Sequence, residues 1–238
     1  MICFLTSRTD DPETGELNTA NRFADELRQC FPTPCRALYV CSNPDGGDKT
    51  DFYASYIRGG FEKAGFLFDS FYTLDGRNEE DAAALVRGSD LLILAGGHVP
   101  TQNCFFQRIG LRELMRDYDG IVIGISAGSM NSADVVYAEP EYEGEAVDPA
   151  YQRFLPGLDL TKTMLIPHYG DVKYEMLDGL RLFPDIVCPD SMGRTFYAIP
   201  DGSYLLIRSP REELRGEAYR IEDGRITKIA AAGETVLL

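Results

Sequence analysis

Short apolar runs alternate with longer amphipathic stretches from the first residues of this chain, and this alternation constrains its fold more than any other feature. Such alternation is typical of β-α units that build a mainly parallel sheet with helices on both faces. The sequence therefore predicts a doubly wound α/β fold. The strands are expected at Ile2–Thr6, Arg36–Cys41, Phe68–Leu74, Leu91–Ala95 and Ile121–Ile125, and the helices at Leu17–Phe31, Thr50–Ala64, Glu79–Arg87 and Gln102–Asp117.

The second half of the chain has a different pattern. An acidic segment, Glu139–Glu145, is expected to form a surface loop, followed by a strand at Met164–Ile166 and a helix near Val172–Phe183. The pairs Asp201-Gly202 and Asp223-Gly224 each stand between apolar runs, which favours β-hairpins because glycine adopts the positive φ that such turns need. These hairpins are expected to extend one edge of the sheet. Their strands are expected at Phe196–Ile199, Ser203–Ile207, Ala218–Ile221 and Ile226–Ile229.

Composition excludes several classes of protein and partner. The 238 residues are 44% hydrophobic and 26% charged, as in ordinary globular domains. Neither a linker nor an internal repeat interrupts the pattern, so a single domain over residues 1–238 is expected. The formal net charge of −15 repels nucleic acids and anionic membranes, so neither is expected as a partner.

The N-terminus and the cysteines favour a cytoplasmic protein. Residues 1–8 lack the features of a signal peptide, and the longest apolar stretch, Leu91–Gly97, is too short to span a bilayer. The six cysteines are scattered without zinc-ligand spacing, which is typical of reduced, buried thiols. We therefore expect neither a metal nor a cofactor.

The segment Gly124–Gly128 carries the clearest chemical motif. It reads G-x-S-x-G, directly after an apolar strand and before a short helical stretch. That context is what a nucleophile elbow requires, because the glycines leave room for a tight turn that exposes the Ser126 hydroxyl. The alternative is an ordinary glycine-rich turn between strand and helix.

Two histidines are available as a general base for such a serine. His168 follows the predicted strand Met164–Ile166, so it is expected at the same carboxyl-end rim of the sheet as Ser126. His98 follows a glycine pair, and the backbone N–H of Gly97 could form an oxyanion hole together with that of Ala127. Contact with substrate is the expected role of His98, with the role of base and simple loop packing as alternatives. His168 could likewise be a hydrogen-bonded loop histidine.

A catalytic triad also needs a carboxylate that orients the imidazole. The acidic segment Glu139–Glu145 lies between the serine and the histidine and contains several candidates. Most of its side chains are expected to be solvated charges, as in other acidic runs. The residues alone therefore leave the choice of acid open.

The glycine pair after the fourth strand, the G-I-S-A-G-S segment at Ser126 and the I-P-H-Y segment at His168 together resemble the peptidase E group of serine peptidases, the S51-type family. The resemblance covers nearly the whole chain and implies a fold related to class I glutamine amidotransferases. It implies Ser126 as nucleophile, His168 as base and, because the family's acid follows its serine by about 15 residues, Glu141 as the orienting acid. Glu139 is a rival. Two departures are Glu141, where peptidase E has Asp, and His98, where it has Asn.

The resemblance implies a cytoplasmic serine hydrolase that cleaves a small peptide through an acyl-enzyme. Because His98 would lie beside the substrate, a preference for N-terminal aspartate is not assumed. An acidic substrate side chain would need a cation, for which Arg194 and Arg153 are candidates, although both could be ordinary surface arginines. The alternatives are an amidotransferase-like acyl-transfer protein, although Ser126 stands where a glutaminase of this fold has Cys, and a non-catalytic binding protein. The C-terminal strands could also pair with a second subunit to form a homodimer.

Overall fold

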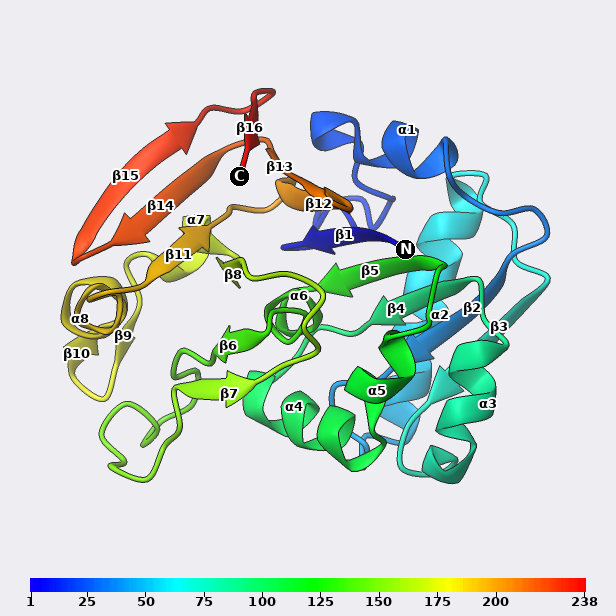
Figure 1. Ribbon diagram of the computed structural model, residues 1–238, viewed down its shortest axis with the longest axis horizontal. Helices are drawn as coiled ribbons and strands as arrows, with labels where there is room; N and C mark the ends of the chain where they lie inside the picture. The colour runs from blue at the N-terminus through cyan, green and yellow to red at the C-terminus, as the bar shows by residue number, and fades with distance from the viewer.

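The computed structural model describes residues 1–238 and has an eight-stranded sheet at its centre (Figure 1). Its strands are β1 (Ile2–Thr6), β2 (Arg36–Val40), β3 (Ser70–Leu74), β4 (Leu91–Leu94), β5 (Ile121–Ile125), β12 (Tyr204–Arg208), β13 (Arg211–Arg215) and β16 (Thr235–Leu237). The first five are parallel, in the order β1-β5-β4-β2-β3, and β12, β13 and β16 continue the sheet beyond β1 as antiparallel strands. The predicted α/β fold is confirmed.

Alternate residues of the parallel strands face two separate apolar cores. Leu92 of β4 belongs to one core, and its neighbour Ile93 belongs to the other. Burial on both faces explains why these strands lack polar alternation. Helices cover the first core with α3 (Ala82–Arg87), α4 (Val99–Arg108) and α5 (Leu111–Met115), and the second with α1 (Phe23–Arg28) and α2 (Asp48–Lys63).

Three of the four helices expected before β5 are shorter than the sequence predicts, whereas the helix expected over Thr50–Ala64 is confirmed as α2. The helix expected over Leu17–Phe31 is a 3-10 turn, η1 (Ala20–Arg22), followed by α1. The helix expected over Glu79–Arg87 begins as the 3-10 turn η2 (Glu79–Asp81) and continues as α3. The helix expected over Gln102–Asp117 is divided between α4 and α5 by Gly110, whose φ is 65°. A left-handed residue ends a helix, and glycine adopts that conformation without steric cost.

A second, four-stranded sheet lies beside the first (Figure 1). It consists of β8 (Met164–Ile166), β11 (Thr195–Ala198), β14 (Ala218–Glu222) and β15 (Arg225–Ala230). The hairpin expected at Asp223-Gly224 is confirmed, since it joins β14 to β15. The hairpin expected at Asp201-Gly202 is wrong. β11 pairs with β8 and β14, whereas β12 pairs with β1 and β13, so this turn crosses from one sheet to the other.

The helix expected near Val172–Phe183 is also wrong. A short helix, α7 (Tyr169–Val172), precedes a small hairpin of β9 (Met176–Leu177) and β10 (Leu180–Arg181). Asp178 and Gly179 form its turn with φ values of 53° and 80°, the left-handed pair that a tight hairpin needs. The chain then continues through a π-helix, η3 (Leu182–Val187), and α8 (Cys188–Asp190).

The acidic segment Glu139–Glu145 connects two paired strands. It lies between β6 (Val135–Tyr137) and β7 (Phe154–Pro156), which pair antiparallel with each other. The β6 strand follows α6 (Ala127–Met130), the short helix that begins after Ser126. None of the helices has the length and apolar character needed to cross a membrane.

We predict that Gly128→Ala destabilises the protein. A Cβ at this position would lie 2.3 Å from the carbonyl oxygen of Leu94, and such overpacking costs about 1–3 kcal/mol. The matched control is Gly59→Ala, in the middle of α2, where nothing lies within 4 Å of the added Cβ. Thermal unfolding followed by circular dichroism should show a lower Tm for the first variant and an equal or higher Tm for the second. Equal Tm values for the two variants would contradict the prediction.

Candidate active site

Ser126 stands at the carboxyl end of β5 in a backbone conformation that L-residues rarely adopt. Its φ is 48° and its ψ is −111°, and α6 begins directly after it. A Cβ at Gly124 would lie 2.8 Å from the backbone nitrogen of Ser129, and a Cβ at Gly128 would lie 2.3 Å from the carbonyl oxygen of Leu94 in β4. Glycine is therefore required on both sides of Ser126. The strand, the strained turn and the helix are the features that the motif predicts.

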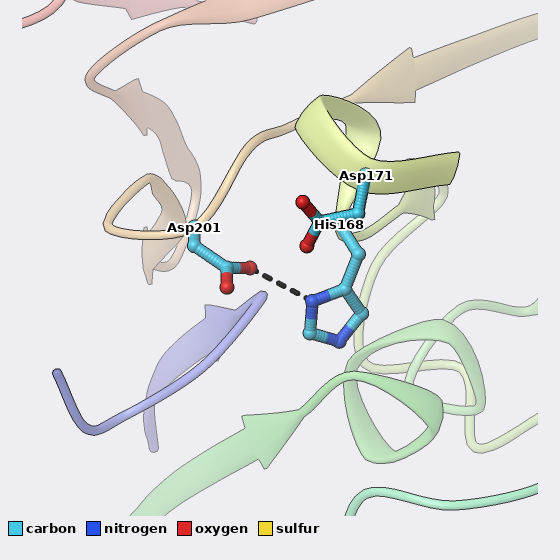
Figure 2. A group of neighbouring side chains, drawn as sticks. All are labelled: His168, Asp171 and Asp201. Carbon is cyan, nitrogen blue, oxygen red and sulfur yellow. Dashed lines mark hydrogen bonds and ion pairs between the residues drawn. The ribbon is translucent and has the colours of Figure 1, made fainter. Parts of the chain in front are cut away.

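His168 lies just beyond β8 and lines the same cavity as Ser126. Its φ of 55° is also left-handed. The Nδ1 atom lies 2.8 Å from Oδ1 of Asp201 (Figure 2). It also lies 3.2 Å from the Ser7 hydroxyl. When Nδ1 carries the proton that it donates to Asp201, Nε2 keeps its lone pair and is able to accept a proton.

Ser7 completes this arrangement from the end of β1. Its hydroxyl donates to Oδ1 of Asp201 over 2.5 Å and accepts the backbone N–H of His168 over 2.9 Å. Burial of Asp201 disfavours its ionised form, but the hydrogen bonds from His168 and Ser7 outweigh that effect and lower its pKa. Arg8 contributes as well, with Nε 3.9 Å from Oδ2 of Asp201. Asp201 is therefore a carboxylate at neutral pH.

The two acids expected from the sequence lie elsewhere. Glu141 accepts the backbone N–H of Val99 over 3.4 Å and makes no hydrogen bond to His168. Glu139 is only 6% exposed, and its buried Oε2 atom has no hydrogen-bond partner. The structure thus places Asp201, which the sequence interpretation missed, against the imidazole. The available signal was the Asp201-Gly202 pair, which the hairpin interpretation treated as a turn only.

Glu139 and Glu141 have strongly perturbed acidities. Burial raises the pKa of Glu139 to about 8, and the neighbouring carboxylates of Glu141 and Glu175 add to the effect. Burial raises the pKa of Glu141 to about 7, although the N–H of Val99 acts in the opposite direction. The smaller shift of Glu141 fits its contact with solvent inside the cavity, whereas Glu139 is shielded.

Gly97 and Ala127, the two oxyanion-hole donors expected from the sequence, lie after β4 and directly after Ser126. Gly97 follows β4 with a φ of 151°, and a Cβ there would lie 2.4 Å from the Ser42 hydroxyl oxygen. Its N–H makes no hydrogen bond within the protein. Ala127 is the first residue of α6, where a backbone N–H has no partner inside the helix. Gly97 lines the same cavity as Ser126.

Both ring nitrogens of His98 have hydrogen-bond partners. Nε2 lies 2.8 Å from Oε1 of Glu145, and Nδ1 lies 2.7 Å from the Thr101 hydroxyl. The ring stacks on Tyr142, with 4.5 Å between the ring centres. The other oxygen of Glu145 accepts the backbone N–H groups of Glu141 and Tyr142. His98 therefore ties the acidic segment to the start of α4 while one side of it lines the cavity.

Ser126 and His168 lie where two cavities meet. The larger has a volume of about 570 Å³ and includes Arg8 and Lys49 among its lining residues. The smaller has a volume of about 210 Å³ and shares Ser126, His168 and Tyr142 with the larger one. No hydrogen bond joins Ser126 to His168 directly.

The arginines expected to bind substrate do not line either cavity. The guanidinium of Arg194 lies 4.3 Å above the ring of Phe154. Arg153 pairs with Asp190 over 2.7 Å. The cations that the structure brings to the larger cavity are Arg8 and Lys49, of which Arg8 is bonded to Asp10 over 3.0 Å.

One group of side chains has the composition of a metal site. His168, Asp171 and Asp201 each offer a ligand atom within 4.8 Å of the others (Figure 2). Imidazole and carboxylate ligands of this kind suit a transition-metal ion. The same contact between His168 and Asp201 also serves to orient an imidazole, so the group has an explanation without a metal.

Comparison with known proteins adds the family and the fold. The model of peptidase family S51 matches residues 36–214. A search of curated proteins finds no match. A solved peptidase from an acI-B1 Actinobacterium is similar over 100% of this chain and 96% of its own, with a TM-score of 0.65 and 17% identity. A putative peptidase E protein from Listeria monocytogenes EGD-e is similar over 96% of this chain and 98% of its own, with a TM-score of 0.62 and 14% identity.

We predict that Glu139→Gln removes part of the pH dependence of stability. Between about pH 4.5 and 8 the unfolded chain ionises Glu139 while the folded protein keeps it protonated, so the free energy of unfolding falls as pH rises. Glutamine has no proton to lose. The decrease in Tm from about pH 5 to about pH 8.5 should be smaller in the variant, by the equivalent of about 1 kcal/mol or more. Glu143→Gln, at an exposed position of the same segment, is the control. Parallel pH profiles for Glu139→Gln and wild type would disprove the prediction.

Proposed function

Since the chain belongs to peptidase family S51 and is therefore a peptidase, we propose that it is a serine peptidase that cleaves small peptides through an acyl-enzyme on Ser126. The family confirms the resemblance seen in the sequence. The observation that carries the proposal is the 2.8 Å contact of Asp201 with His168, which lines the same cavity as Ser126. A serine, a histidine and a carboxylate at one site are the parts of a hydrolytic triad.

The first chemical step uses the free nitrogen of the imidazole. Nε2 of His168 takes the proton of the Ser126 hydroxyl as its oxygen attacks the peptide carbonyl. The carboxylate of Asp201 holds the ring by Nδ1 and stabilises the positive charge that develops on it. His168 then gives the proton to the leaving amine, and water repeats the sequence to release the acyl group.

The tetrahedral intermediate needs donors for its negatively charged oxygen. The unpaired N–H of Gly97 and the first N–H of α6, at Ala127, are the donors we assign. Both belong to segments that end buried strands, so their positions depend on the rigid part of the sheet. Gly97 is constrained further by Ser42, which leaves no room for a side chain.

In the triad that we propose, Asp201 replaces Glu141, the orienting acid expected from the sequence. It bonds the ring nitrogen and is ionised, whereas Glu141 bonds a backbone N–H and has a raised pKa. The triad we propose is therefore Ser126, His168 and Asp201. The cavity of about 570 Å³ lies within the usual range for small-molecule sites, which supports a small peptide as substrate.

We predict that Ser126→Ala abolishes peptide turnover. The wild type and the variant would be incubated with a dipeptide library that includes Asp-X, Glu-X and isoaspartyl members, and the remaining peptides would be counted by mass spectrometry. Loss of the nucleophile should lower the rate by at least about 1,000-fold. Equal depletion of peptides by the two folded proteins would refute the role of Ser126, and no depletion by wild type would refute the peptidase assignment for these substrates.

A second prediction separates the candidate acids. Asp201→Asn should lower kcat by about 10²- to 10⁴-fold, because an amide stabilises neither the required tautomer nor the imidazolium. Glu141→Gln should leave kcat within about tenfold of wild type if it takes no part in the proton transfer. The measurement is steady-state kinetics on any peptide that the library identifies. A larger loss of kcat in Glu141→Gln than in Asp201→Asn would restore the glutamate as the triad acid.

A further inference from the structure

The smaller of the two cavities at the site is strongly acidic. Three glutamates line its volume of about 210 Å³, namely Glu139, Glu141 and Glu175, and neither lysine nor arginine does. The His168 imidazole is the one basic side chain among the lining residues. Carboxyl groups that share a small space repel each other when ionised, so this arrangement favours a positively charged guest.

Glu139 provides a second and independent observation. The residue is only 6% exposed, and its buried Oε2 atom has no hydrogen-bond partner in the protein. Buried carboxyl groups are normally hydrogen-bonded, because an unsatisfied polar group costs free energy. Its position in the cavity lining means that a donor supplied by a ligand could satisfy it.

The walls of the cavity are suited to the rest of such a ligand. Met130, Val172 and Leu182 also line the cavity and contribute apolar surface to it. An aliphatic stem could pack on these side chains while a cationic end reaches the carboxylates, as lysine and arginine side chains do in protein interiors.

We propose that this cavity binds a cationic nitrogen of the substrate, an ammonium or guanidinium group, through Glu139, Glu141 and Glu175. The inference rests on the proposed function, because Ser126 and His168 line the same cavity. The residue that carries the cation therefore flanks the bond that is cleaved. The source of the charge is either a basic side chain or the free amino group at the start of the peptide.

The test measures binding without turnover. Isothermal titration calorimetry on Ser126→Ala would use N-acetyl-lysinamide, which has only a side-chain cation, and alaninamide, which has only an α-ammonium group. N-acetyl-alaninamide is the neutral probe. Binding by N-acetyl-lysinamide identifies a basic side chain, and binding by alaninamide identifies the amino terminus. At least one cation should bind at least about tenfold more tightly than the neutral probe. Equal affinity of all three probes, or absence of binding by both cations, would overturn the proposal.

Variants then locate the binding site. In the Ser126→Ala background, Glu139→Gln and Glu141→Gln should each weaken cation binding by about tenfold, whereas Glu143→Gln, exposed and outside the cavity lining, should not. Unchanged affinity in a folded Glu141→Gln protein would overturn the assignment even if Glu139→Gln fails to fold. Cation binding by a protein whose wild type cleaves no peptide would contradict the proposed function and leave the cation site intact.

Discussion

Two consecutive residues at the end of β1, Thr6 and Ser7, hold the backbone of Ser126 and of His168 in place. The carbonyl oxygen of Thr6 accepts the backbone N–H of Ser126 over 3.0 Å, and the Ser7 hydroxyl accepts that of His168 over 2.9 Å. Ser126 and His168 both have positive φ values, a conformation that persists only when the surroundings enforce it. The Ser129 hydroxyl donates to the same Thr6 oxygen over 2.7 Å. The site therefore depends on the position of β1 in the middle of the central sheet.

Ser7 also joins the two sheets. β1 belongs to the central sheet, whereas His168 follows β8 of the smaller one, and Asp201 lies on the segment that crosses between them. The contacts among Ser7, His168 and Asp201 thus form a seam where three distant parts of the chain meet. The same hydrogen bonds hold the proposed triad and join the two sheets. A substitution that breaks them therefore affects both the triad and the packing of the sheets.

The sequence predicts the parts of the fold that local patterns determine. The predicted bounds of β1, β5 and β8 agree with the structure, because short apolar runs buried on both faces leave a clear signal. The sequence does not identify Asp201 as the partner of His168. Their contact depends on the pairing of β11 with β8 and of β12 with β1, and these strands are distant in sequence. A local Asp-Gly signal does not distinguish a hairpin turn from a crossing between sheets. The raised pKa of Glu139 is likewise not predictable from the sequence, because it results from burial and not from residue type.

The pairing of β1 with β12 determines when, during synthesis, the proposed hydrolase becomes active. Residues 2–6 find their antiparallel partner at residues 204–208, so nearly the whole chain must leave the ribosome before the central sheet is complete. A nascent chain that ends soon after His168 contains the serine and the imidazole but lacks the carboxylate that orients it. Its first strand also has an open edge on the side that β12 later covers. The proposed hydrolase would therefore be inert during its own synthesis and would become active only when the C-terminal strands have docked.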